Sequence, residues 1–274
     1  GNGFVSNLRY NLRMQQTSEF GSLLKDWRQR RRMSQLDLAL EAEISSRHLS
    51  FIETGRSRPT RSMVLKIAAR LEIPLRECNT LLLSAGHAPE YREAQGRDAA
   101  SSALLATLSE MIGRMAPLPA LIVDGGWNLL AANPMIGLLI AGADPQLLAA
   151  PINVLRLSLH AKGLAGRIRN LGEWHTHVLE RLDRQCLQTG DRRLQALAAE
   201  LRSYPVPDVS SSERSTAPAV TLQIDMDGTL LSLISTTMVI GGPRDIVLAE
   251  MAIEMFLPAD EATRAWLESA HKGL

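Results

Sequence analysis

Three polar side chains lie at helical spacing within the stretch 34–59. Ser46, Arg47 and Ser50 fall in the first turns of a predicted helix, where hydroxyl and guanidinium groups can reach outward. Arginine can donate two parallel hydrogen bonds to guanine, and serine can bond to several base edges. These residues therefore predict a helix whose polar side chains are free to reach DNA base edges.

Such a helix needs a partner against which to bury its apolar side. Ser45 is a good N-cap for the base-reading helix, in which Leu49 and Ile52 face inward and which Gly55 ends. Ser34 can cap a preceding helix. Its apolar positions are expected to keep one face dry: Leu36, Leu38, Ala39 and Ala42. The pair is a predicted helix-turn-helix.

Further helices complete an all-α bundle of five. The first begins at Thr17 or Ser18, the fourth is capped by Thr60, and the fifth runs from Pro74 to Gly86. The apolar positions of the first helix are Phe20, Leu23, Leu24 and Trp27. Arg28, near its end, is placed to pair with Glu53 and brace the motif.

Charge is distributed unevenly along the chain. Residues 1–96 carry 15 Lys and Arg against 10 Asp and Glu, whereas the remainder carries 15 against 19. A basic amino-terminal part suits binding to the phosphates of double-stranded DNA. The helix-turn-helix inside this part favours DNA over a merely solubilising surface.

Composition limits the remaining classes of protein. The chain has 274 residues, 45% of them hydrophobic, which is enough for two globular domains. Its 2 cysteines, Cys78 and Cys186, have no disulfide framework around them, and no apolar run approaches the ~18 residues of a membrane span. We expect a cytoplasmic protein with no membrane segment and no cofactor.

The amino-terminal pattern resembles the XRE (Cro/C1-type) helix-turn-helix family. The matching residues are Ser34-Gln35, Leu38-Ala39, Ser45, Leu49, Ile52-Glu53, Gly55 and Pro59. The resemblance implies phosphate contacts from Gln35, Arg56, Arg58 and Arg61, and base contacts from Ser46, Arg47 and Ser50. It implies that Arg47 is the principal base reader, through two hydrogen bonds to guanine. Phe51 stands where relatives often place a polar reader, so a thymine-methyl contact or packing is expected there.

The pattern changes after a linker over 91–101. Predicted strands span 120–123, 127–132, 219–226 and 229–239, with turns at 124–126 and at Asp227-Gly228. Helices are expected from Ser102, from Asn133-Pro134, within 164–201, and over a last segment that includes 247–256. Antiparallel hairpins with helices to one side predict an α+β domain over 102–274, following a DNA-binding domain over 17–90.

This order of elements resembles a PAS-like sensor, and the motifs are similar to those of the MmyB-like regulators. The matching motifs are 47–59, Asn153-Val154-Leu155-Arg156 with His160, Asn170-Leu171 with Trp174, Tyr204-Pro205 and 256–260. Ala161 departs from the proline usual in relatives. The resemblance implies a transcription regulator whose second domain holds a small apolar ligand such as a fatty acid.

Four residues are candidates to meet that ligand. Arg156 and His160 could hold a polar head group, since arginine suits a carboxylate. Trp127 and Trp174 could border an apolar chain. Each of the four could instead belong to the core or brace the fold.

Two motifs indicate other chemistry and are set aside. Asp225-Met226-Asp227-Gly228 imitates the first motif of haloacid-dehalogenase-like phosphatases, but the only lysine after it is Lys272. A hairpin turn is the better interpretation, and we expect no enzyme. His175 and His177 point about 200° apart on a helix, so one metal ion cannot take both.

The sequence therefore predicts a one-component regulator. Its partners are a double-stranded DNA operator, a small-molecule ligand and a second copy of the chain in a homodimer. The alternative is a DNA-binding regulator whose second domain is a protein-interaction or dimerisation module without a physiological ligand.

Overall fold

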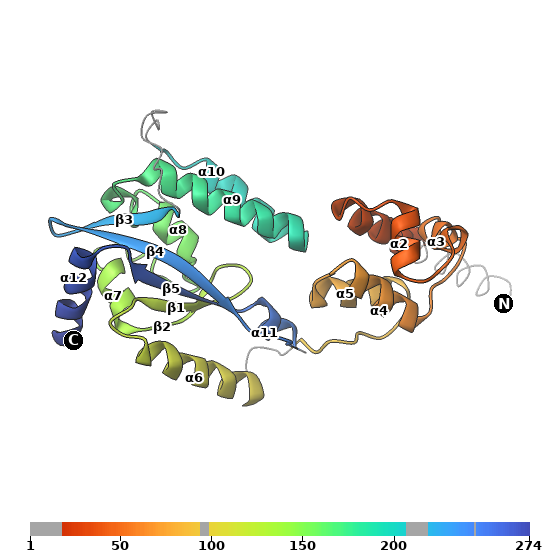
Figure 1. Ribbon diagram of the computed structural model, residues 1–274, viewed down its shortest axis with the longest axis horizontal. Coiled ribbons are helices and arrows are strands. Elements are labelled where there is room, and N and C mark those ends of the chain that lie inside the picture. The colour runs from red at the N-terminus through yellow and green to blue at the C-terminus, as the bar shows by residue number, and fades with distance from the viewer. Residues whose placement is uncertain (1–17, 94–98, 207–218, 244) are drawn as a thin grey trace, which may run out of the picture. The chain divides into compact units, whose positions relative to one another are not determined.

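The computed structural model describes residues 18–93, 99–206, 219–243 and 245–274 (Figure 1). The chain divides into two compact units, the first made mainly of residues up to Glu93 and the second mainly of those that follow. Each unit is described by itself.

The first unit is the expected bundle of helices. A helix described over 18–30 is followed by α2 (Gln35–Glu41), α3 (Ser46–Glu53), α4 (Arg61–Arg70) and α5 (Leu75–Ser84). Local capping fixes these bounds. Ser34 and Asp37 form a capping box, and the hydroxyls of Ser45 and Thr60 accept from the third residue beyond them. Gly55 and Gly86 adopt φ of 74° and 72°, the left-handed conformation that ends helices.

The core of the first unit lies between α2, α3, α4, α5 and the helix 18–30. Its largest fully buried side chains are Phe20, Leu24, Leu38, Leu49, Ile52, Ile67, Leu71, Leu81 and Leu82. The expectation for Leu36 is wrong, because this side chain is 59% exposed. Leu36 is two residues before Leu38 and so points to the opposite side of α2, beside the exposed Leu40.

The second unit is built on an antiparallel sheet of five strands. They are β1 (Ala120–Val123), β2 (Leu129–Ala132), β3 (Thr221–Met226), β4 (Thr229–Val239) and β5 (Ala252–Pro258), in the spatial order β2-β1-β5-β4-β3. The predicted hairpins β1–β2 and β3–β4 are both present, and Asp227 and Gly228 form the second turn at positive φ. The α+β fold class is confirmed.

The predicted last helix over 247–256 is wrong. The short α11 (Ile246–Glu250) is followed by β5, and α12 (Glu261–Lys272) comes later. β5 pairs with both β1 and β4, so it is the central strand that joins the two hairpins. Apart from Glu250 and Glu254, the residues from 246 to 257 are apolar, and a short apolar run does not distinguish a helix from a buried strand.

Helices cover both faces of this sheet, rather than one as expected. On one face Ile112 of α6 (Ala99–Arg114) packs against Ala120, Ile122 and Ile253. The opposite face carries the main core, to which several helices contribute (Figure 1): α7 (Pro134–Ile140), α8 (Val154–Leu159), α9 (Leu171–Thr189), α10 (Arg192–Arg202) and α12, together with the 3-10 turn η1 (Ala165–Arg167).

Two local details differ from the sequence-based expectation. Trp127 adopts φ of 66° and belongs to the turn before β2, so the strand begins at Leu129. Asn133 precedes α7 as predicted, but its side chain does not cap the helix. It accepts from Ala120 N and donates to Ile112 O and Leu118 O, which ties α6 and β1 to the start of α7.

Candidate DNA-reading surface and ligand pocket

The predicted base readers lie on α3. Ser46 and Arg47 are exposed, while Ser50 and Phe51 are half-buried. The Arg47 guanidinium lies 5.4 Å from the centroid of the Phe51 ring, and that of Arg56 lies 6.0 Å from it. Phe51 therefore supports two of the predicted DNA-contacting arginines by cation–π contact.

A buried ion pair holds α3 against the first helix. Arg28 Nε and Nη2 donate to the two carboxylate oxygens of Glu53 at 2.7 and 3.0 Å. This confirms the pairing predicted from the sequence. Gln35 Nε2 donates to the same carboxylate at 2.7 Å, so one amide hydrogen of this predicted phosphate contact is already engaged.

Arg58 and Arg61 are attached to the carbonyl end of α5 and the residues after it. Arg58 Nε donates to Ala85 O at 2.7 Å and its Nη2 to Gly86 O at 2.9 Å. Arg61 donates to Ala88 O and pairs with Glu90. Their contact with DNA phosphates stays a prediction, and the structure adds that Arg58 also satisfies helix carbonyls.

Replacing Arg58 with alanine should therefore have two effects. The salt dependence of DNA binding should become flatter by roughly one unit of slope, because one phosphate neutralisation is lost. The free energy of unfolding should fall by about 1 kcal/mol, because Ala85 O and Gly86 O lose their hydrogen-bond donor. Binding titrations over a range of salt concentrations and thermal denaturation measure the two effects. Arg70→Ala, at the far end of α4, is the control, and a salt slope equal to the parent's would remove Arg58 from the phosphate contacts.

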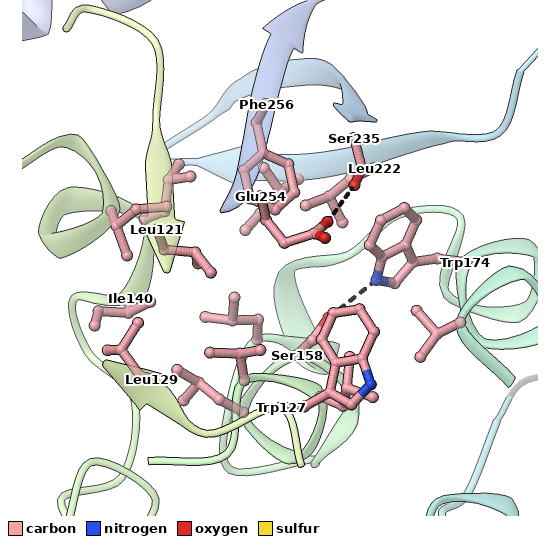
Figure 2. A pocket seen from close by; sticks show the side chains of 18 of the residues that line it. Leu121, Trp127, Leu129, Ile140, Ser158, Trp174, Leu222, Ser235, Glu254 and Phe256 are labelled. Carbon is pink, nitrogen blue, oxygen red and sulfur yellow. Dashed lines mark hydrogen bonds between the residues drawn. The ribbon is translucent and has the colours of Figure 1, made fainter. Parts of the chain in front are cut away.

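The second unit contains an apolar cavity of about 90 Å³ between the sheet and the helices that cover its main core face (Figure 2). Strand residues such as Leu121, Leu222 and Phe256 form its wall on the sheet side. Helical residues complete the lining, among them Ile136, Leu139, Val154, Leu155, Leu157 and Val178. A lining of aliphatic side chains with a few polar groups is typical of small-molecule sites.

Two of the four predicted ligand residues border this cavity. Trp127 and Trp174 both line it, and both indole nitrogens are engaged. Trp127 Nε1 donates to Gln185 Oε1 at 2.7 Å. Trp174 Nε1 donates to Ser158 Oγ at 2.9 Å, as Figure 2 shows. Their rings are thereby fixed in orientation along the cavity wall.

Arg156 and His160 are not among the residues that line the cavity. Arg156 donates through Nε and Nη2 to the Glu200 carboxylate, both at 2.7 Å, and lowers the pKa of Glu200. His160 packs edge-on against Tyr204, whose hydroxyl also donates to Glu200. Burial and this hydrogen bond raise the pKa of Tyr204 to about 12. These contacts brace α8 against α10, and a part for the two residues in ligand binding stays a prediction.

Sequence reasoning missed the polar groups that do line the cavity. Arg181 of α9 pairs with Glu254 of β5. Ser235 Oγ donates to the same carboxylate at 3.1 Å, as Figure 2 shows. His177 stacks on Trp174 with ring centroids 5.4 Å apart. A glutamate within the apolar run 252–257 was the one available signal, because such a residue is rarely buried unless paired.

The two motifs that the sequence analysis set aside, the phosphatase-like segment at Asp225 and the pair His175 and His177, can now be placed in the structure. Asp225 ends β3, accepts from Gly228 N at 2.8 Å and pairs with Arg169, as a hairpin turn requires. His175 Nε2 contacts Leu201 O at 3.0 Å, whereas His177 lines the cavity. Within the described residues no group of three or more His, Cys, Asp or Glu side chains could hold a metal ion.

The fold and the two sites define the class of protein: a helix-turn-helix unit followed by an α+β unit with an apolar cavity. Residues 104–270 match the family model of the MmyB-like transcription regulator ligand binding domain, and residues 24–78 match a helix-turn-helix model. The chain thus belongs to the MmyB-like transcription regulators. A search among curated proteins finds no match.

The family assigns DNA and a small molecule as partners, and it describes regulator domains rather than enzymes. Of the helices in the described ranges, none is both long and apolar enough to cross a membrane.

Proposed function

We propose that this regulator binds a small ligand with a flexible, fatty-acid-like aliphatic chain, and that the ligand changes its affinity for a DNA operator. The apolar cavity in the second unit is the observation that carries this proposal. Its lining is mostly leucine, isoleucine and valine, which suits an aliphatic chain better than a stacked aromatic ligand. We place this activity in the cytoplasm.

The coupling requires two states of the protein. A ligand shifts an equilibrium only by its difference in affinity for the two states. We propose that the protein is a homodimer and that the ligand favours one arrangement of its two helix-turn-helix units. Because two recognition helices must be spaced by about one turn of DNA, a change in their spacing changes operator affinity.

Filling the cavity should abolish the response to ligand. Val154 borders the cavity, and Val154→Phe places an aromatic ring in it. In the parent protein, octanamide or octanoate should raise the free energy of unfolding. The gain should be about 2.7 kcal/mol when the concentration of the compound is a hundred times its Kd. In Val154→Phe neither compound should do so, and operator binding should no longer respond to them. Val239→Phe, at an exposed valine outside the cavity, should behave like the parent.

A second measurement separates this function from the alternative of a protein-interaction module. Solvent extraction of the purified protein, followed by mass spectrometry, should release an aliphatic compound. A protein that releases none, and that neither eight-carbon compound stabilises, would contradict the ligand-binding proposal and favour a dimerisation or protein-interaction module.

A further inference from the structure

The cationic group at the cavity, the guanidinium of Arg181, is bound to protein partners through both of its terminal nitrogens. Arg181 Nη1 donates to Glu254 Oε2 at 2.9 Å, and its Nη2 donates to Glu254 Oε1 and to Thr237 Oγ1. The guanidinium also lies 4.5 Å from the centroid of the Trp127 ring. Both terminal nitrogens are thus used, and the positive charge is balanced by the carboxylate.

The carboxylate partner, Glu254, is held in place by its surroundings. Glu254 is 4% exposed, lies on the central strand and also accepts from Ser235. A ligand anion that took Arg181 for itself would leave this buried carboxylate without its cation, which is strongly unfavourable. It would also bring a second negative charge close to Glu254.

The remaining polar groups at the cavity are uncharged. His177 is half-buried, and burial followed by the charges of Arg181 and Arg184 lowers its pKa. At neutral pH its imidazole therefore offers one N–H donor and one acceptor nitrogen. Ser158 Oγ accepts from Trp174, so its own hydroxyl hydrogen can be donated to another group.

We propose that this cavity selects an aliphatic ligand whose polar group is uncharged, such as an amide, ester, ketone or alcohol, over the corresponding carboxylate. The proposal rests on the ligand-binding function proposed above. The Arg181–Glu254 pair closes the polar end as a neutral unit. Ser158 and His177 can supply the hydrogen bonds that a carbonyl or hydroxyl needs.

The test compares two probes of nearly equal shape, octanamide and octanoate, at neutral pH. Binding to the full chain is followed by tryptophan fluorescence, because Trp127 and Trp174 line the cavity, and by calorimetry. Octanamide should bind about tenfold more tightly than octanoate, or better, because it brings no charge into the cavity.

Removing the charge of Glu254 should reverse this preference. In Glu254→Gln the Arg181 charge is no longer balanced, so octanoate should gain about tenfold relative to octanamide. The matched control is Glu200→Gln, because Glu200 pairs with Arg156 and does not line the cavity. That variant should keep the preference of the parent.

The outcomes distinguish this inference from the function on which it rests. Octanoate binding to the parent as tightly as octanamide, or more tightly, overturns the inference and leaves the ligand-binding function standing. Absence of binding by both probes overturns both. The comparison in the parent decides the matter even where Glu254→Gln does not fold.

Discussion

Glu53→Gln should lower the free energy of unfolding of the first unit by about 3–5 kcal/mol. The substitution keeps the shape of the side chain but leaves the Arg28 guanidinium buried without its counter-charge. The side chains of Arg28 and Glu53 are only 10% and 2% exposed, so water cannot replace the lost partner. Gln35 loses part of the same contact, because its amide donates to the Glu53 carboxylate.

A surface ion pair of the same unit provides the control. Arg61 and Glu90 are paired with side chains 39% and 42% exposed, and Glu90→Gln should cost less than about 1 kcal/mol. Denaturant titration of the full chain, combined with amide hydrogen exchange of α2 to α5, measures both variants. If both variants lost the same small amount of unfolding free energy, the Arg28–Glu53 pair would not brace the motif.

Arg47→Ala should weaken operator binding by about 1–3 kcal/mol and relax the preference at one base pair. Arg47 is exposed on α3 and contacts Phe51, so the substitution removes the predicted base contact without opening the core. Binding of the variant to a set of operators mutated at single positions measures the change. The loss should be confined to one position of the operator.

Arg47→Lys separates charge from geometry. Lysine keeps the positive charge but not the planar fork that bonds guanine at two atoms. This variant should therefore keep the salt dependence of the parent while losing discrimination at the same base pair. Unchanged discrimination in both Arg47 variants would remove this residue from the base readers.

Features fixed by neighbouring residues were predictable from the sequence. Ser34, Ser45 and Thr60 cap helices through bonds to residues three positions away, so type and spacing sufficed to find them. The Arg28–Glu53 pair could also be predicted, because the helix-turn-helix pattern already placed α3 against the first helix.

Features that depend on distant pairing were not predictable in the same way. Arg181 and Glu254 meet across 73 residues, and nothing in the local sequence of either indicates the other. The sequence predicts a helix over most of β5, because the strand character of this segment comes from its neighbours on both sides, β1 and β4. Arg156 was a candidate from its residue type alone, and on α8 its partner Glu200 directs it away from the cavity.

The central position of β5 has a consequence during synthesis of the chain. Both hairpins precede it, and neither is bonded to the other until residues 252–258 lie between them. A premature stop after Met251 would also remove Glu254 and Phe256 from the cavity. The truncated product would retain the whole helix-turn-helix and lose the assembled sheet. Under the function proposed above, a late nonsense mutation would therefore leave a DNA-binding fragment that no longer responds to the ligand.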